Sequence, residues 1–149
     1  MMENYDESCV RPGKSIDVLA LEFAAIHHAG QFDEDNKPVI CHPITVAGLV
    51  EGGEKERAAA YLHDVLEDTD ASETEIRKLF GDEITDAVVA DTRQEGEDYF
   101  DYIERVKKNP IAVKVKIADL KHNLSRETDK TSKRYETHEK AYADLIKLT

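Results

Sequence analysis

Segments with the periodicity of α-helices follow one another along almost the whole chain, and a glycine, a proline or a capping residue separates most of them. Apolar residues in 15–29 recur at close to the helical period, and Gly30 follows as a stop signal. Pro43 and Pro110 stand where the first turn of a helix tolerates proline. Strand patterns are short and weak, so the sequence predicts an all-α helical bundle.

The predicted helices lie close together in the sequence. They cover residues 15–29, 43–50, 54–69, 72–80, 82–92, 99–109, 110–124 and 132–148, with 31–41 as a loop. Ser72 and Glu75 match a capping box, and Gly81 breaks the helix that they open. Residues 112–118 alternate like a strand, but they lie within a longer window that fits a helix.

Length and internal pattern indicate one domain. No repeat, proline-rich linker or low-complexity tract divides the chain, and 149 residues are enough to bury one core. We therefore expect a single domain over 1–149, with its core at about 15–125 and a closing helix at about 132–148.

The charge balance limits the classes of partner. The formal net charge of −12, with 32 acidic and 20 basic residues, argues against a nucleic-acid or anionic-membrane surface. The first residues have no apolar run of signal-peptide type, and no segment is long and apolar enough to span a bilayer, so we expect a cytoplasmic protein. Cys9 and Cys41 lie outside any CxxC spacing, so we predict neither a disulfide framework nor a thiolate zinc site.

Four ionisable residues stand among apolar neighbours in three separate segments. They are His42 in 38–50, His63 and Asp64 in 58–66, and Asp119 in 115–120. Burying such groups without partners costs several kcal/mol each, so they should be paired, neutralised or bound to a metal. If the three segments are neighbours in the bundle, two imidazoles and two carboxylates converge on one site.

Nitrogen and oxygen ligands without thiolates suit one divalent ion, with Mn²⁺ as our first expectation and Fe²⁺ or Zn²⁺ as the alternatives. Other interpretations exist for the single residues. His42 alone is more often a loop or helix-entry residue, and Asp119 alone is more often an ion-pair partner of a neighbouring lysine. The adjacent pair of His63 and Asp64, enclosed by Ala, Leu and Val, favours the metal site.

Glu67 and Asp68 extend the polar surface of the same predicted helix. Each lies four residues after one of the adjacent pair, Glu67 after His63 and Asp68 after Asp64, and therefore on the same face one turn along. Beside a metal, such carboxylates can orient and deprotonate a water or protonate a leaving group. The alternative is an acidic helix end that is exposed to solvent.

With these residues in view, the chain resembles the HD-domain superfamily of metal-dependent phosphohydrolases, and in particular the alarmone (ppGpp) hydrolase domains of RelA/SpoT proteins and their small single-domain relatives. The resemblance rests on "HAGQ" at 28–31, "PVICHP" at 38–43, "LHDVLEDT" at 62–69 and "KIADLKHNL" at 116–124. It implies a fold of the HD-domain type and hydrolysis of a nucleotide's phosphate or pyrophosphate ester, most specifically the 3′-pyrophosphate of ppGpp.

The resemblance also implies roles for individual residues. It implies that the metal is bound by His42, His63, Asp64 and Asp119. It also implies that Glu67 and Asp68 act on the attacking water and that Asn123 contacts the nucleotide. His28 matches the "HxGQ" motif, which implies a structural role near the pocket. Lys37 and Arg126 offer positive charge for phosphate.

The chain departs from the family pattern in the region that meets the substrate. The alarmone hydrolases usually carry an Arg-Lys pair after "HxGQ", where this chain has Asp33 and Glu34. This reversal of charge keeps two alternatives open: a phosphatase for another nucleotide, such as an NADPH-like or nucleoside phosphate, and a catalytically silent nucleotide-binding module. The expected partner is a small-molecule nucleotide, with no nucleic acid or membrane, and the sequence leaves the oligomeric state undetermined.

Overall fold

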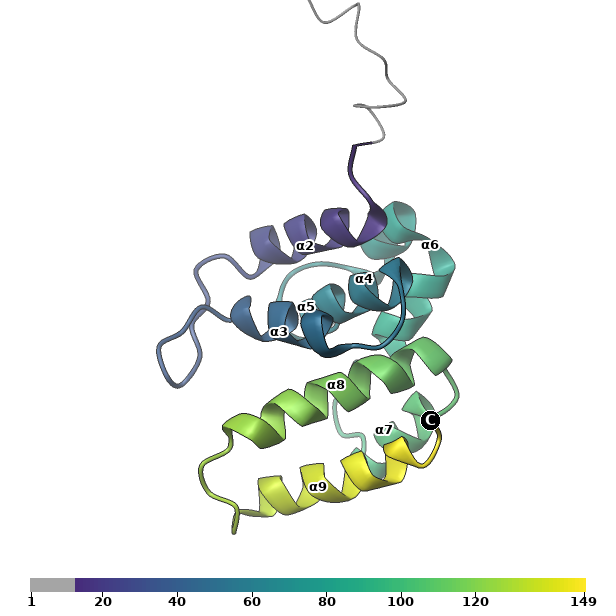
Figure 1. The fold of residues 1–149 in the computed structure, drawn as a ribbon. Coiled ribbons are helices and arrows are strands. Elements are labelled where there is room, and N and C mark those ends of the chain that lie inside the picture. The colour runs from purple at the N-terminus through teal and green to yellow at the C-terminus, as the bar shows by residue number, and fades with distance from the viewer. Residues whose placement is uncertain (1–12) are drawn as a thin grey trace, which may run out of the picture.

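The computed structural model describes residues 13–149, which fold as helices joined by short loops (Figure 1). The helices are α2 (Ile16–His27), α3 (Cys41–Leu49), α4 (Glu54–Leu62), α5 (Val65–Asp68), α6 (Glu73–Ala90), α7 (Tyr99–Val106), α8 (Pro110–Arg126) and α9 (Lys133–Ile146). Over this part of the chain, β pairing is limited to one isolated bridge between Phe32 and Pro38. The predicted all-α class is confirmed, whereas Cys9 lies outside the described residues.

Capping residues begin the helices where the sequence predicts them. The Ser72 hydroxyl accepts from the Glu75 backbone N–H at 3.1 Å, and the Glu75 carboxylate accepts from the Ser72 N–H at 3.3 Å, which is the predicted capping box. Asn109 caps α8 by accepting from the Ala112 N–H at 3.0 Å. The alternating segment 112–118 is helical, as predicted, because it lies inside α8.

Gly81 interrupts α6 as the sequence predicts. Its φ of 84° and ψ of 174° are not helical, and the axis kinks there although helical residues continue on both sides. A positive φ of this size is readily adopted only by glycine. The predicted helices 72–80 and 82–92 therefore correspond to the two helical parts of α6, on either side of the kink.

The single helix predicted for 54–69 is wrong, because the structure divides it at His63 and Asp64. α4 ends at Leu62 and α5 begins at Val65. The ring Nδ1 of His63 and its backbone N–H both meet the Ala60 carbonyl, at 2.7 and 3.4 Å, which tightens the last turn. The break turns the His63 ring into the bundle.

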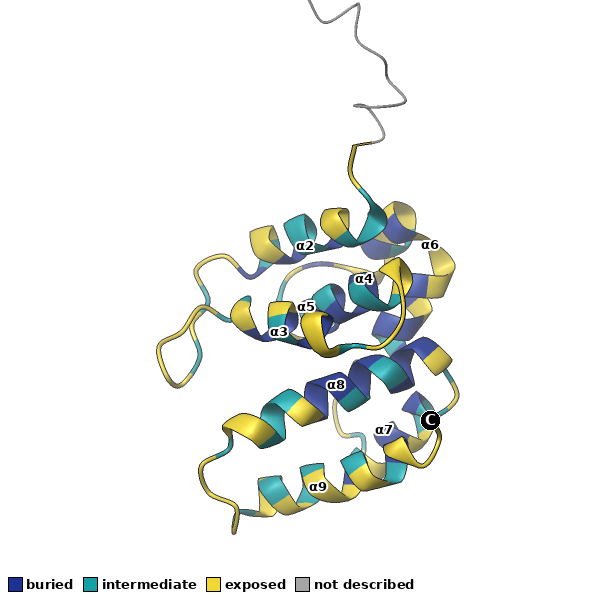
Figure 2. Cartoon of the chain, in the orientation of Figure 1, coloured by how far each residue is buried: buried dark blue, intermediate teal, exposed yellow. Residues whose placement is uncertain are grey.

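α4 is the central helix, and α2, α3, α6 and α8 all pack against it. α8 also packs against α3, α6, α7 and α9, so it lies beside α4 near the middle of the bundle (Figure 1). Both helices carry many buried residues, drawn dark blue in Figure 2. The largest side chains that are completely buried in the core include Leu62, Ile103, Leu120 and Leu145.

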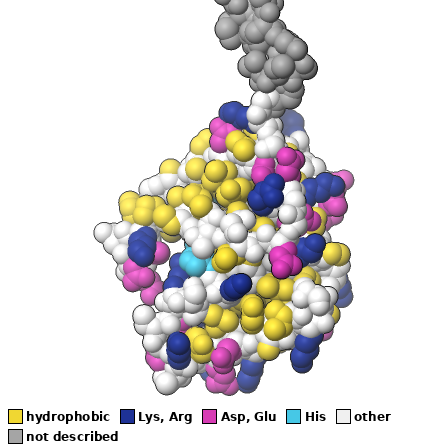
Figure 3. All heavy atoms as spheres, in the orientation of Figure 1, with side chains coloured by type: hydrophobic (Ala, Val, Ile, Leu, Met, Phe, Trp, Pro, Cys, Tyr) yellow, Lys and Arg dark blue, Asp and Glu magenta, His cyan; other side chains and the backbone are white. Residues whose placement is uncertain are grey.

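The loop between α2 and α3 projects from the body of the bundle (Figure 1). The Asp33 N–H donates to the Lys37 carbonyl at 2.8 Å, and Asn36 takes a positive φ of 62° at the turn. On the face that Figure 3 shows, acidic and basic side chains are mixed with exposed hydrophobic ones. Among the described residues, no helix has the length and apolar character required to cross a membrane.

Candidate metal centre and active site

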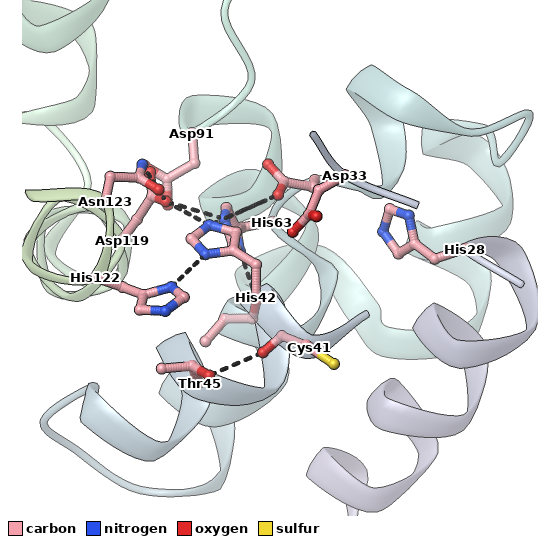
Figure 4. Close-up of polar contacts among 12 residues, drawn as sticks. His28, Asp33, Cys41, His42, Thr45, His63, Asp91, Asp119, His122 and Asn123 are labelled. Carbon is pink, nitrogen blue, oxygen red and sulfur yellow. Dashed lines mark hydrogen bonds and ion pairs between the residues drawn. The ribbon is translucent and has the colours of Figure 1, made fainter. Parts of the chain in front are cut away.

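Three elements that are distant in sequence bring two imidazoles and two carboxylates together. His42 comes from the first turn of α3, His63 and Asp64 from the junction between α4 and α5, and Asp119 from the middle of α8. Figure 4 shows His42, His63 and Asp119 pointing toward one another. The sequence predicted this convergence on condition that the three segments were neighbours, and the packing of α3, α4 and α8 meets that condition.

The separations are short enough for these side chains to share one ion. One ligand atom each from His42, His63 and Asp119 lies within 4.8 Å of the others. Asp64 Oδ2 lies 3.3 Å from His63 Nε2 and 3.9 Å from His42 Nε2. His42, His63 and Asp119 therefore form one group, and Asp64 lies next to both imidazoles while it belongs to a second group with Glu67 and Asp68.

The orientation of His63 is the clearest sign that a ligand belongs there. Its Nδ1 donates to the Ala60 carbonyl at 2.7 Å, and its Nε2 is buried with no hydrogen-bond partner. A buried imidazole nitrogen that is left without a partner is costly, whereas a metal ion would satisfy it. The residues present therefore fit a divalent ion.

Asp119 is held as a carboxylate by its neighbours. Its Oδ1 lies 2.7 Å from His42 Nε2 and accepts from Asn123 Nδ2 at 3.1 Å, and its Oδ2 accepts from Lys116 Nζ at 2.9 Å. Burial opposes its ionisation, but the Lys116 ammonium and the hydrogen bond from His42 hold the pKa of Asp119 well below its usual range. The site therefore presents an ionised carboxylate to a cation.

The acids around His63 alter its basicity. Burial by itself would lower the pKa of His63, but Asp64 and Asp119 outweigh this effect and raise the pKa to about 10 when no metal is present. The same negative charges that stabilise a proton on this ring would stabilise a divalent cation between the ring and the carboxylates.

Glu67 and Asp68 form a second acidic cluster with Asp64. One carboxylate oxygen from each lies within 4.8 Å of the others. Burial and the charge of Asp64 raise the pKa of both Glu67 and Asp68. The predicted single strip along one helix face is wrong for His63, because the break turns its ring toward His42 and Asp119.

The "HAGQ" segment supports the turn that carries the acids. His28 is almost fully buried, and its Nδ1 lies 2.8 Å from Gln31 Oε1. Gln31 Nε2 in turn donates to the Asp68 carbonyl at 2.8 Å. His28 therefore has the structural position near the pocket that the motif implies.

The residues predicted to meet the substrate divide into two groups. Asn123 and Arg126 line a cavity of about 340 Å³ together with Asp33 and Glu34. The Arg126 guanidinium donates to Asn123 Oδ1 at 3.0 Å and lies 4.0 Å from the Asp33 carboxylate. Lys37 is exposed on the projecting loop and is not among the residues that line this cavity.

The sequence interpretation missed two residues of this region. His122 follows Asp119 by three residues on α8, and its Nδ1 lies 2.7 Å from His42 Nδ1. Asp91 is buried after α6, both of its carboxylate oxygens lack a partner, and burial raises its pKa well above the usual range. The apolar run before Asp91 is the same signal that marked Asp64 and Asp119.

Comparison with known proteins shows the class to which this fold and site belong. The HD-domain family matches residues 20–145, and the chain belongs to that family.

Several relatives carry names that refer to one nucleotide. The chain is 35% identical over 116 residues to a probable guanosine-3′,5′-bis(diphosphate) 3′-pyrophosphohydrolase of Synechocystis sp., covering 68% of this chain and 15% of that protein. It is 33% identical over 116 residues to a guanosine-3′,5′-bis(diphosphate) 3′-pyrophosphohydrolase of Aquifex aeolicus, covering 70% of this chain and 17% of the relative. The chain therefore spans about a sixth of the length of these curated relatives.

A solved structure shares the fold over nearly its whole length. It is described as "A metazoan ortholog of SpoT hydrolyzes ppGpp and plays a role in starvation responses". The TM-score is 0.75 at 27% sequence identity, and the match covers 89% of this chain and 86% of that one. The predicted fold of the HD-domain type is thus confirmed.

Proposed function

We propose that this protein is a metal-dependent phosphohydrolase that acts on a nucleotide, and that its substrate is ppGpp, from which it removes the 3′-pyrophosphate. The observation that carries the proposal is the convergence of His42, His63, Asp64 and Asp119 beside a separate pair of acids. The relatives named above support ppGpp as the substrate.

The ligand set favours one divalent ion, with Mn²⁺ as the first candidate. Two imidazole nitrogens and two carboxylate oxygens are suited to Mn²⁺, Fe²⁺ or Zn²⁺, and Mn²⁺ accepts carboxylate ligands most readily of the three. When bound, such an ion lowers the pKa of water and neutralises phosphate charge.

Glu67 and Asp68 are the proposed proton-transfer residues. In hydrolysis the attacking water loses a proton and the 3′ oxygen of the leaving nucleotide gains one. A carboxylate whose pKa is raised, as burial and Asp64 raise that of Glu67, is a better base near neutral pH than an ordinary one. Glu67 is also fixed in place, because its Oε1 accepts from the Arg93 N–H at 3.1 Å.

Asn123, Arg126 and Lys37 are the proposed substrate contacts. Asn123 donates to Asp119 and accepts from Arg126, so it links the metal centre to the cavity between α8 and the projecting loop. A phosphate there would meet the guanidinium of Arg126, which is well suited to phosphate oxygens. Lys37, exposed on the projecting loop, adds a further positive charge.

Asp33 and Glu34 favour a second candidate, a phosphatase for a different nucleotide. Both line the cavity with Arg126, and Glu34 Oε1 lies 3.9 Å from Arg134, another lining residue. Carboxylates at these places weaken the attraction for a highly charged substrate such as ppGpp. A less anionic nucleotide, for example an NADPH-like one, would tolerate them better.

A substrate panel tests the proposal. Protein loaded with Mn²⁺ is incubated separately with ppGpp, GDP, GTP and NADPH, and released phosphate and pyrophosphate are measured. We expect pyrophosphate from ppGpp at the highest kcat/KM. Turnover of another nucleotide with ppGpp left intact would support the second candidate, and turnover of none would indicate a silent binding module.

A further inference from the structure

We infer that His122 is a positioning residue for the metal centre, whose ring Nδ1 accepts the hydrogen bond that directs His42 Nε2 at the ion. The inference rests on the proposed metal site and adds a residue to it. The observation behind it is the separation of 2.7 Å between the two Nδ1 atoms, drawn as a dashed line in Figure 4.

The geometry joins the two rings closely. Their centroids lie 5.0 Å apart and their planes differ by 16°, so the two rings are nearly parallel and meet through their Nδ1 atoms. His122 is three residues after Asp119 on α8, and the two side chains therefore share a face. One helix thus supplies both a proposed ligand and the support for another ligand, which comes from α3.

A contact between two ring nitrogens at this distance requires one proton between them. With two protons the N–H groups would collide, and with none the lone pairs would repel. A neutral imidazole that binds metal through Nε2 carries its proton on Nδ1. In the metal-bound state, His42 Nδ1 must therefore donate and His122 Nδ1 must accept.

His63 shows the same arrangement with a different acceptor. Its Nδ1 donates to the Ala60 carbonyl at 2.7 Å, which leaves Nε2 free for the ion. The two imidazoles are thus oriented by one backbone oxygen and one side-chain nitrogen. Partners of this kind fix the tautomer of a ligating histidine, and their loss typically weakens metal affinity 10–100-fold.

The alternative role for His122 is ring packing against His42, and matched substitutions separate the two. His122→Asn retains an acceptor near the position of Nδ1 but loses the ring. His122→Leu has nearly the shape of asparagine and no acceptor, and His122→Phe retains an aromatic ring without an acceptor. The side chain is only partly buried, so all three substitutions are compatible with the fold.

The experiment is calorimetric titration of Mn²⁺ into the metal-stripped full-length chain and its three variants at one pH. Circular dichroism of the metal-free proteins checks the fold. We expect His122→Asn to bind Mn²⁺ within a few-fold of the parent protein. We expect His122→Leu and His122→Phe to bind about 10–100-fold more weakly. The visible spectrum of the Co²⁺ form should change in the same two variants.

Two results would overturn the inference while leaving the metal site in place. Unchanged Mn²⁺ affinity in His122→Leu and His122→Phe would show that the acceptor is not used. Weakening in His122→Asn but not in His122→Phe would assign His122 to ring packing alone. If the parent chain itself binds no Mn²⁺, Co²⁺ or Zn²⁺, the proposed function fails together with the inference.

Discussion

The ring of His63 and the backbone carbonyl of Ala60 are joined by a hydrogen bond of 2.7 Å, and this one contact ends a helix and aims a proposed ligand. Because Nδ1 is used in this way, Nε2 is left buried without a partner among two carboxylates and a second imidazole. The hydrogen bond at the end of α4 is therefore also the contact that orients His63 Nε2 in the site.

Removal of Asp64 should empty the metal site. Its Oδ2 lies 3.3 Å from His63 Nε2, and without it two imidazoles and one carboxylate remain. We expect Asp64→Ala to bind Mn²⁺ at least about 100-fold more weakly, since changes in supporting residues alone cost 10–100-fold, and to lose hydrolysis. Metal analysis after dialysis measures this, with the exposed Asp70→Ala as the control. Full metal content in Asp64→Ala would remove Asp64 from the ligand set.

Substitution of Glu67 should lower turnover and leave metal binding unchanged. Its carboxylate is held by the Arg93 N–H and lies with Asp68 beside the proposed ligand Asp64. Glu67→Gln retains the hydrogen-bond acceptor but loses the base, so we expect kcat to fall about 10²–10⁴-fold with unchanged metal content. Steady-state kinetics measures kcat and metal analysis measures metal content. Glu139→Gln, at an exposed position of α9, is the control. Near-normal turnover in Glu67→Gln would contradict the assigned role.

The acids of the projecting loop should weaken binding of anionic substrates. Asp33 lies 4.0 Å from Arg126, and Glu34 lies 3.9 Å from Arg134, so each offsets a positive charge in the cavity. We expect the double variant Asp33→Asn, Glu34→Gln to lower KM for ppGpp several-fold at low salt, and the effect to shrink as ionic strength rises.

The control for the loop is the pair Glu83→Gln and Asp101→Asn, exposed acids of α6 and α7 that do not line that cavity. This control variant loses the same number of negative charges as the double variant of the loop. An equal fall in KM in this control would assign the effect to overall charge, and no change in either variant would show that the loop acids do not meet the substrate.

Glu97 should contribute to stability in a defined pH range. Arg105 donates to both of its carboxylate oxygens, at 3.0 and 2.9 Å, and also reaches the Thr92 carbonyl at 2.8 Å. The Arg105 guanidinium and the Gln94 N–H lower the pKa of Glu97 from 4.5 to about 2. A lowered carboxyl pKa stabilises the folded state fully above the unfolded value, and this stabilisation is lost as pH falls from about 4.5 toward 2.

Thermal unfolding of the parent protein and of Glu97→Gln across this range measures the effect. The parent should have the higher Tm near pH 6, and the difference should narrow as the carboxylate becomes protonated. A difference that stays constant from pH 6 to pH 2.5 would mean that the charge of Glu97 does not contribute.

Much of this architecture could be predicted from the sequence because the signals are local. Ser72 with Glu75, Pro110 after Asn109, and Gly81 mark helix ends through interactions within a few residues. Asp119 and His42 were identifiable because an ionisable group in an apolar run requires a partner.

The features that could not be predicted depend on tertiary contacts. Residues 54–69 are rich in helix formers, so the pattern predicts one helix, whereas at the break the His63 ring lies against His42 of α3 and Asp119 of α8. In the sequence, His122 lies in a polar segment near the end of a predicted helix. Its contact with His42 depends on the packing of α3 against α8. Its spacing of three residues from Asp119 was the available clue.

Hydrolysis should require an ion held by His42, His63, Asp64 and Asp119. The most direct measurement strips the protein of metal, assays it with ppGpp, and repeats the assay after adding one equivalent of Mn²⁺. The expected result is no product from the stripped protein, and GDP and pyrophosphate in equal amounts after Mn²⁺ is restored. Hydrolysis at the same rate with and without metal, or intact ppGpp and other nucleotides after reconstitution, would contradict it.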